Sequence, residues 1–387
     1  MSPLGPSRMS RATSLALGLG LISTGAVGNA HAEPTFLSKQ YTRCTACHYS
    51  DTGGGLLTPY GRSLSREAIS MLGARGTEDD AANEGAAGEE AFLGGLLDGV
   101  LSPLALGLSL RPSHLRFATS GHSIPDRNFF MNLDLLAAYQ TDRWTLYGEV
   151  GRQPTPDGGI LDSYEHWVSY RIRDGLRVRA GRFLPAYGIR LADHTAFSRQ
   201  FLGLAQYDQL YGVELSVSTE RTLLQVAASP GPADAIVDDD GGQAFTTAGR
   251  VQVDLNSRSV LAGSVLYRHA TGRSPWSTDA GLAVGFAPTP RVTTWTQVDL
   301  RTRTASNHAY IVTHQTSVET LRGVWIRVSP QVYWTDHNPL LEKRRLVLGV
   351  DFFPRTHWHL NLSYYRDRNP VSDRSSRTFL AQLHVYL

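Results

Sequence analysis

From about residue 106 to the end of the chain, apolar and polar side chains alternate in runs of roughly ten residues that are separated by turn-forming residues. One late run shows the pattern clearly. There Val324, Ile326 and Val328 alternate with Arg327 and Ser329. Side chains of a β-strand point alternately to opposite faces, so each run predicts a strand with one apolar face and one polar face. The alternation alone fits either a soluble β-sandwich or a membrane barrel.

The lengths of the connections between these runs separate the two folds, because an outer-membrane barrel has short turns at its periplasmic rim and longer loops outside. The short connections lie near Asp142-Arg143, Asp174-Gly175, Glu220-Arg221, Asn256-Ser257, Thr289-Pro290, Leu321-Arg322 and Pro354-Arg355. The longer ones lie near 121–127, 154–160, 184–208, 231–243, 271–277, 336–343 and 368–375, and only the connection at 305–307 is shorter than this rule expects. The sequence therefore predicts an all-β fold, an outer-membrane antiparallel barrel of about 16 strands over residues 106–387. A barrel of that size has an aqueous lumen, which needs a solute or a plug.

The first 32 residues have the order of an export signal. Arg8 and Arg11 precede an apolar run from Leu15 to Ile22, and Ala30-His31-Ala32 offers a cleavage site. An uncleaved signal anchor is the alternative, although the apolar run is short for a membrane span. We expect the mature chain to begin near Glu33 in the periplasm of a Gram-negative bacterium.

Two cysteines occur in the chain, Cys44 and Cys47, and His48 follows them directly. After export they could form a disulfide, act as a redox-active pair or hold a haem. A thioredoxin-like pair needs a βαβ context, and a structural zinc site needs two more ligands that residues 33–105 do not contain. Cysteines at this spacing form thioether bonds to both vinyl groups of a porphyrin, and the adjacent histidine ligates the iron. We therefore expect one covalent haem c at Cys44, Cys47 and His48.

The second axial ligand of the haem iron is open. Met71 is the one candidate near the cysteines, in a helix-like stretch from Ser63 to Leu72, although it could instead pack against the porphyrin. Histidines that would project into the lumen are further candidates, or ordinary lumen residues: His357, His359 and His384.

The segment at 33–76 is predicted to be a monohaem cytochrome c-like plug, on the periplasmic side or inside the lumen, since so few residues cannot enclose a porphyrin without another surface. Residues 77–105 are predicted to be an acidic flexible linker and lead-in, because 77–90 is rich in Asp and Glu and poor in apolar residues. The apolar stretch from Ala91 to Leu110 is interpreted as the run into the first strand, because Pro103 and several glycines disfavour a transmembrane helix.

The segment from Phe36 to Arg62 resembles the fused outer-membrane cytochrome-porins, the single-haem iron oxidase family of iron-oxidising bacteria. The resemblance lies in Cys44-Thr45-Ala46-Cys47-His48 followed by Pro59-Tyr60-Gly61-Arg62. It covers about thirty residues, and the barrel adds only a similar layout. The resemblance implies that Cys44, Cys47 and His48 hold the haem, and that electrons pass from an extracellular donor to periplasmic carriers.

Three functions follow as hypotheses. The first is electron transfer across the outer membrane by the single haem, with ferrous iron as one candidate donor and soluble periplasmic cytochromes as partners. The second is a diffusion porin that the haem segment gates. The third is a barrel sleeve around a separate multihaem cytochrome. The net charge is +2, and the Lys and Arg residues are spread along the chain. This distribution does not favour a nucleic-acid partner. No arrangement of nucleophile and base supports hydrolytic catalysis.

Other polar residues have two interpretations each. Asp234, Asp238, Asp239 and Asp240 could bind iron at the outer mouth, or form a solvated acidic loop. The connection from Leu184 to Gln209 could fold into the lumen, where Asp193, His194 and Arg199 would form a constriction, or could lie outside as a lid. Residues expected to face the lumen could set selectivity in a porin, or could simply keep the lumen wet; they are Arg177, Arg179, Asp299, Arg301, Arg327 and Gln331.

Overall fold

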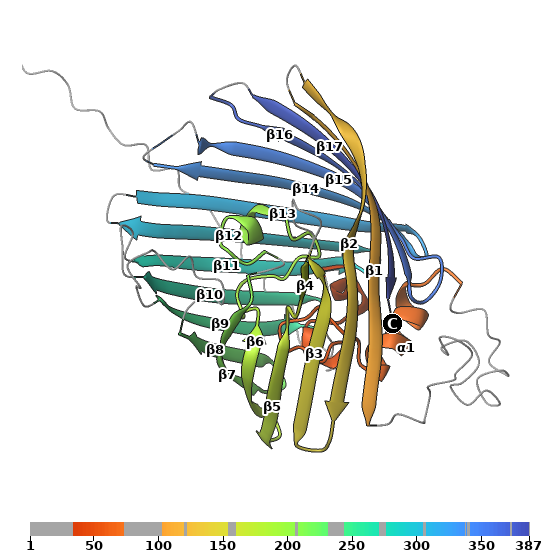
Figure 1. The fold of residues 1–387 in the computed structure, drawn as a ribbon, viewed down its shortest axis with the longest axis vertical. Helices are drawn as coiled ribbons and strands as arrows, with labels where there is room; N and C mark the ends of the chain where they lie inside the picture. The colour runs from red at the N-terminus through yellow and green to blue at the C-terminus, as the bar shows by residue number, and fades with distance from the viewer. Residues whose placement is uncertain are drawn as a thin grey trace, which may run out of the picture.

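Figure 1 shows the computed structural model of the chain, an antiparallel β-barrel with helical turns of the N-terminal segment at one end. The structure describes residues 34–72, 103–119, 122–153, 160–205, 208–230, 244–270, 276–304, 307–336, 338, 341–371 and 374–386. In this described part of the chain, no helix has both the length and the apolar character needed to cross a bilayer.

The strands follow one another in sequence around the barrel. They are β1 (Leu104–Thr119), β2 (His122–Gln140), β3 (Trp144–Gln153), β4 (Ile160–Asp162), β5 (His166–Arg173), β6 (Leu176–Phe183), β7 (Leu210–Ser218), β8 (Thr222–Ser229), β9 (Ala244–Asn256), β10 (Ser259–Ala270), β11 (Trp276–Thr289), β12 (Val292–Thr304), β13 (Asn307–Leu321), β14 (Val324–Thr335), β15 (Lys343–Phe352), β16 (Trp358–Arg368) and β17 (Ser375–Tyr386). The helical elements are η1 (Pro34–Lys39), η2 (Cys44–Ala46), α1 (Pro59–Leu64), η3 (Ser65–Ile69) and α2 (Phe197–Gln200).

The barrel closes because β1 pairs with β2 on one side and with β17 on the other, both antiparallel. Of the seventeen strands, β4 and β5 pair with different parts of β3, so together they fill one position. The barrel therefore has 16 strand positions, as the sequence predicts. β1 starts and β17 ends at the rim that carries the short turns, where Leu104 pairs with Tyr139 and Ser109 with Tyr386.

The alternation in the sequence corresponds to an apolar outer face and a polar inner face. On β14, Ile326 and Val328 are exposed, whereas Arg327 and Ser329 are buried inside the barrel. On β2, Leu135 is 62% exposed while its neighbour Asp134 is buried. A soluble protein has the opposite arrangement, so this outer surface is suited to lipid.

Two boundaries differ from the sequence expectation. Residues 122–127 of the loop expected at 121–127 belong to β2, in which His122 pairs with Thr119 of β1. Pro125 lies where the register shifts between Leu115 and Phe117, and a β-bulge is a position where a strand tolerates proline. β1 begins at Leu104, two residues inside the segment predicted to be a linker.

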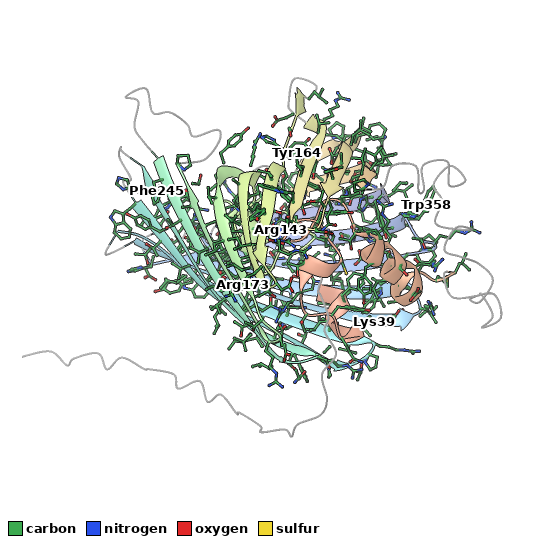
Figure 2. All side chains as sticks on the ribbon, turned by 90° about the horizontal axis from the view of Figure 1, so that it is seen from below. Lys39, Arg143, Tyr164, Arg173, Phe245 and Trp358 are labelled. Atoms are coloured by element: carbon green, nitrogen blue, oxygen red, sulfur yellow. The ribbon has the colours of Figure 1, made fainter. Side chains whose placement is uncertain are left out.

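Two segments fill much of the lumen. One is the N-terminal segment, described over residues 34–72 and called the plug below. The other is the β6–β7 connection, described over residues 184–205 and called the inner loop, which confirms the interpretation that this connection folds inward. Plug residues Tyr49 and Leu56 share one apolar cluster with Phe197 and Leu202 of the inner loop and with the wall residue Leu266. Figure 2, seen from below, shows the plug enclosed by the strands.

Candidate functional site

The residues of the predicted haem motif lie on a single helical turn. The carbonyl of Cys44 accepts from the backbone N–H of Cys47 at 3.2 Å and from that of His48 at 3.1 Å. Side chains three and four residues apart on such a turn are neighbours. Cys44, Cys47 and His48 are therefore neighbours on this turn.

Two glycines allow the rest of the plug to close around this turn. A Cβ on Gly61, in α1, would lie 2.3 Å from the carbonyl oxygen of Cys47. A Cβ on Gly53 would lie 3.0 Å from Cys44 Sγ, and Gly53 has a φ of +81°, in the region that favours glycine. α1 itself starts at Pro59, with the Thr58 side chain accepting from the Gly61 N–H at 3.1 Å. The Pro-Tyr-Gly-Arg sequence thus packs against the cysteine motif.

Cys44 faces a cavity inside the barrel, between the plug, the inner loop and the wall. The cavity has a volume of about 50 Å³. The plug contributes Cys44, Asp51 and Thr52, and the inner loop contributes residues 184–190. Strands β8 and β9 complete the cavity. Cys47 is buried.

His48 is half-buried, and one of its ring nitrogens lacks a hydrogen-bond partner among the described residues. Burial, and then the charge of Arg190, lower the pKa of His48 to about 4, so its imidazole is neutral at neutral pH. Its Nδ1 atom is buried with no hydrogen-bond partner in the described part of the structure. A neutral imidazole is the form that ligates a metal.

Arg250 of β9 lies on the cysteine side of the cavity. Its guanidinium is within electrostatic range of Cys44. It donates to the carbonyl of Gly188 at 2.9 Å and to the side-chain oxygens of Gln225 and Gln252 at 3.3 and 2.6 Å. These partners are neutral, and Arg250 makes no direct ion pair among the described residues. A lumen cation in this state can accept an anionic group.

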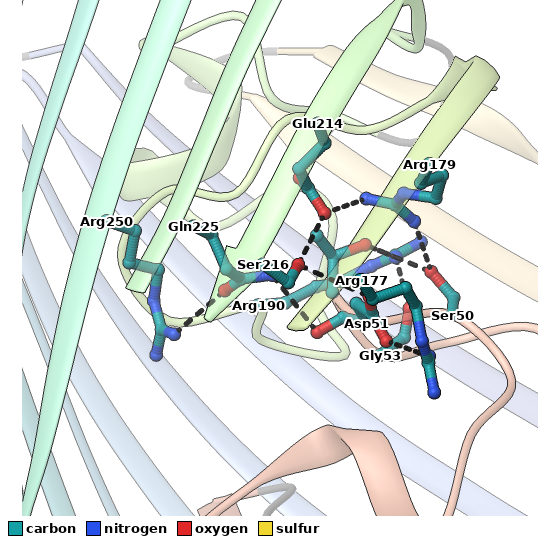
Figure 3. A network of polar contacts seen from close by, with 11 residues as sticks. Ser50, Asp51, Gly53, Arg177, Arg179, Arg190, Glu214, Ser216, Gln225 and Arg250 are labelled. Atoms are coloured by element: carbon teal, nitrogen blue, oxygen red, sulfur yellow. Dashed lines mark hydrogen bonds and ion pairs between the residues drawn. The ribbon is translucent and has the colours of Figure 1, made fainter. Parts of the chain in front are cut away.

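The plug is held to the wall by a polar network on its Ser50–Gly53 side (Figure 3). Asp51 pairs with Arg177 of β6 at 2.7 Å and accepts from Ser216 of β7 at 3.3 Å. Ser50 accepts from Arg179 at 3.3 Å, and Arg179 is itself fully buried in an ion pair with Glu214. These contacts fix the segment that follows His48.

The inner loop joins this network through Arg190. Arg190 binds the Gly53 carbonyl, the Thr52 hydroxyl at 3.2 Å and the carboxylate of Glu165 at 3.2 Å. The loop itself is also fixed to the wall by α2, where the Phe197 N–H donates to Gln331 of β14 at 2.8 Å. The inner loop is thus a fixed wall of the cavity that Cys44 faces.

A second set of contacts fastens the plug to the short-turn rim. Arg43 pairs with Asp254 at 2.7 Å and donates to the backbone oxygens of Thr219 and Glu220. Lys39 forms an ion pair with Glu319. At the plug's C-terminal end, Arg322 donates to the carbonyl of Ser70 at 2.9 Å.

The alternative axial ligands expected from the sequence lie elsewhere. The Met71 N–H donates to the carbonyl of Phe353 at 2.9 Å, beside the β15–β16 turn, and its side chain is 38% exposed. His359 pairs with Asp351 at 2.9 Å and His384 contacts Ser109 at 3.2 Å. The described lining of the Cys44 cavity includes neither Met71 nor these histidines.

His357 has a φ of +70°, and both of its ring nitrogens are buried without a hydrogen-bond partner among the described residues. Its ring packs edge-on against Tyr386 at 5.9 Å. This position, before β16, is also outside the described lining of the Cys44 cavity.

The residues expected to form a constriction serve to fold the inner loop. Asp193 accepts from the backbone and hydroxyl of Thr195 at 2.9 and 2.7 Å. Arg199 donates to the carbonyls of Leu204 and Leu191 at 3.0 and 2.6 Å and lines the cavity. Burial is the main cause that lowers the pKa of His194.

The lumen residues expected to set selectivity are also engaged. Arg301 pairs with Asp279 at 2.6 Å, Asp299 accepts from Tyr187 at 3.0 Å, and Arg327 pairs with Asp351 at 3.3 Å. Like Arg177, Arg179 and Gln331, these residues bind the plug, the inner loop or a neighbouring side chain of the wall.

Several sequence interpretations lie outside the described residues. They are the export signal at 1–32, the acidic segment at 77–90, and Asp234, Asp238, Asp239 and Asp240. Among the described residues, no group of three or more His, Cys, Asp or Glu side chains is placed to hold a metal ion.

The sequence interpretation missed Arg43, Arg190 and Arg250, which bind the plug to its surroundings or face its cysteine. A signal for one of them was present, because Arg250, Gln252 and Asp254 alternate with apolar residues along β9 and must therefore face the lumen. Nothing in the sequence marks Arg43 or Arg190 as partners of residues so distant in the chain.

No family model and no curated protein matches this chain. Solved structures with a similar fold are outer-membrane proteins. The chain matches OprB of Pseudomonas putida with a TM-score of 0.58 and 9% identity, covering 76% of this chain and 97% of the other. It matches the outer membrane channel DcaP of Acinetobacter baumannii with a TM-score of 0.56 and 12% identity, covering 73% and 97%. It matches an anion-selective porin from Comamonas acidovorans with a TM-score of 0.56 and 10% identity, covering 73% of this chain and 99% of the other. At these identities the likeness shows a porin-type barrel fold.

Proposed function

We propose that this protein attaches one haem c through Cys44 and Cys47, with His48 as an iron ligand, and passes electrons across the outer membrane. One observation carries the proposal. The three residues lie on one helical turn, and Cys44 lines a cavity inside the barrel. The plug is too small to enclose a porphyrin by itself, so the inner loop and strands β8 and β9 would complete the haem pocket.

The haem would supply one-electron chemistry between the ferric and ferrous states. The residues of the chain would do the rest. Cys44 and Cys47 tether the porphyrin, and His48 offers a neutral nitrogen. Arg250 lies within electrostatic range of Cys44, so its positive charge would act on a haem tethered there. The apolar cluster of plug and inner loop excludes water from the same region.

Two features of the molecule support an orientation in the membrane. The apolar outer face and the porin-type fold support an outer-membrane location. Short turns face the periplasm in such barrels, so the plug would lie on the periplasmic side. Electrons from an extracellular donor, of which ferrous iron is one candidate, would leave through the plug to soluble periplasmic carriers.

Electron transfer can be tested in proteoliposomes that contain a trapped redox dye, with ferrous iron or another reductant added outside. Haem-loaded protein should reduce the dye, and a Cys44→Ala/Cys47→Ala variant should not. A haem that stays ferric with every donor tried, in protein shown to carry haem, would contradict the proposal.

A diffusion porin is the second candidate, because the solved structures of similar fold include channels. The filled lumen argues against it, since polar wall residues such as Arg177 and Gln331 bind the plug or the inner loop. The same filling leaves little room for a separate multihaem cytochrome inside the barrel. Planar-bilayer conductance distinguishes a porin from an electron conduit.

A further inference from the structure

The short-turn rim of the barrel carries an arginine at every described turn. The arginines are Arg143, Arg173, Arg221, Arg258, Arg291, Arg322 and Arg355, one for each of the connections β2–β3, β5–β6, β7–β8, β9–β10, β11–β12, β13–β14 and β15–β16. All except Arg258 are exposed. The carboxylates in the same turns are fewer, namely Asp142, Asp174 and Glu220.

Few of these rim arginines are used inside the molecule. Within the described residues none of them forms an ion pair, although Arg143 donates to the Tyr170 hydroxyl and Arg322 holds the plug through backbone oxygens. The connections at the other end of the barrel, apart from the inner loop, contain more Asp and Glu than Arg. Residues 231–243, between β8 and β9, include four aspartates and no arginine. The turns at the rim where the plug lies are therefore richer in arginine than the connections at the other end.

The plug presents aromatic side chains inside this ring of arginines. Tyr60 of α1 is 52% exposed, and its hydroxyl lies 3.1 Å from that of the half-buried Tyr41. The Tyr41 ring packs against Phe36 at 6.2 Å, and Tyr41 lies within electrostatic range of Cys47. Figure 1 places α1 beside the end of β17, at the rim. Surface tyrosines with arginines around them are typical of the centre of a protein–protein interface.

We infer that this face, the rim arginines around Tyr41 and Tyr60, is the docking surface for an acidic soluble electron-carrier protein. The inference rests on the proposed function, because it names the class of partner that meets the haem end of the plug. The ring of positive charge steers an acidic partner towards the opening, and the tyrosines give it a contact next to Cys47. Lipid headgroups can reach the outer side of the ring, but they cannot reach the plug surface within it.

Binding is the direct test, measured by interferometry on the full chain in nanodiscs of neutral phosphatidylcholine. Two probes are used, a soluble c-type cytochrome of strongly acidic net charge and one of strongly basic net charge. The acidic probe should bind at about 0.02 M salt and lose most of its binding at about 0.5 M, where the Debye length is only a few ångströms. The basic probe should not bind.

The variant for this test is Arg221→Glu/Arg291→Glu, since neither side chain bonds to the plug in the described structure. It should slow association of the acidic probe about tenfold at low salt, within the range that electrostatic steering supplies. Arg374→Glu is the matched control, an exposed arginine in the β16–β17 connection at the other end of the barrel, and it should change nothing.

Three results would overturn the inference. The first is equal binding of both probes, and the second is unchanged binding of the acidic probe by the double variant. The third is a double variant that loses binding to phosphatidylglycerol vesicles while binding of the acidic probe is unchanged, which would assign the ring to lipid. Neither measurement needs the haem, so protein that binds the acidic probe but carries no haem would contradict only the proposed electron transfer.

Discussion

Arg43 joins the start of the cysteine motif to the barrel wall, because its Nε donates to Oδ2 of Asp254 on β9 at 2.7 Å. The two residues are 211 positions apart in the sequence, and Arg43 directly precedes Cys44. Both side chains are about nine-tenths buried. This ion pair therefore couples the placement of the motif to the closed barrel.

Arg43→Ala should release the first part of the plug from the rim. It removes the ion pair with Asp254 and the hydrogen bonds to Ser218, Thr219 and Glu220, all in a mostly buried site. Removing one partner of such a pair costs about 3 kcal/mol. Hydrogen exchange of residues 34–72 should accelerate while the strands keep their protection. Arg374→Ala, at an exposed site, is the control, and equal exchange in both variants would count against the role given to Arg43.

Gly61→Ala should prevent the plug from closing around the cysteine motif, because the added Cβ would lie 2.3 Å from the Cys47 carbonyl oxygen. We expect a several-fold loss of haem per protein, measured by absorbance against protein mass. Gly249→Ala is the matched control, since nothing lies within 4 Å of its Cβ position. Wild-type haem content in the Gly61 variant would show that the close approach is not needed.

The sequence was sufficient for the barrel, because alternation and turn chemistry are local properties that each strand carries by itself. It was misleading over residues 122–127, where β2 contains a bulge, since a bulge and a turn use the same residues. It left the direction of the inner loop open, because length does not tell whether a loop folds in or out. The contacts that decide this, such as Phe197 with Gln331, join residues far apart in the chain.

The candidate site could be predicted only in part. Cys44, Cys47 and His48 are close together in the sequence, so their spacing indicates the chemistry. Arg250 reaches the same site through the closure of the barrel, which no local pattern records. Met71 was a candidate because it follows the motif in the sequence, yet it lies beside Phe353.

Arg250→Gln should lower the midpoint potential of the haem. A nearby cation favours the reduced state, which carries one positive charge fewer, and Arg250 lies within electrostatic range of Cys44. We expect a fall of about 60 mV, a tenfold change in a one-electron equilibrium. Arg250→Lys should restore much of the potential. A redox titration that gives the same potential for all three proteins would exclude Arg250 from the haem environment.

The full chain should conduct poorly in planar bilayers, because the plug and the inner loop share one apolar cluster inside the barrel. An open porin of similar strand number serves as the positive control. Large, stable currents through the haem-loaded protein would favour a diffusion channel.

The central claim is a covalent haem at Cys44, Cys47 and His48, and the most direct measurement is the reduced-minus-oxidised absorption spectrum of the purified full chain, with intact mass on the same sample. We predict a c-type spectrum and a mass increase equal to one haem, both lost in Cys44→Ala/Cys47→Ala. A protein that matures in a host able to attach haem c, folds as a barrel and carries free or disulfide-bonded cysteines would contradict the account.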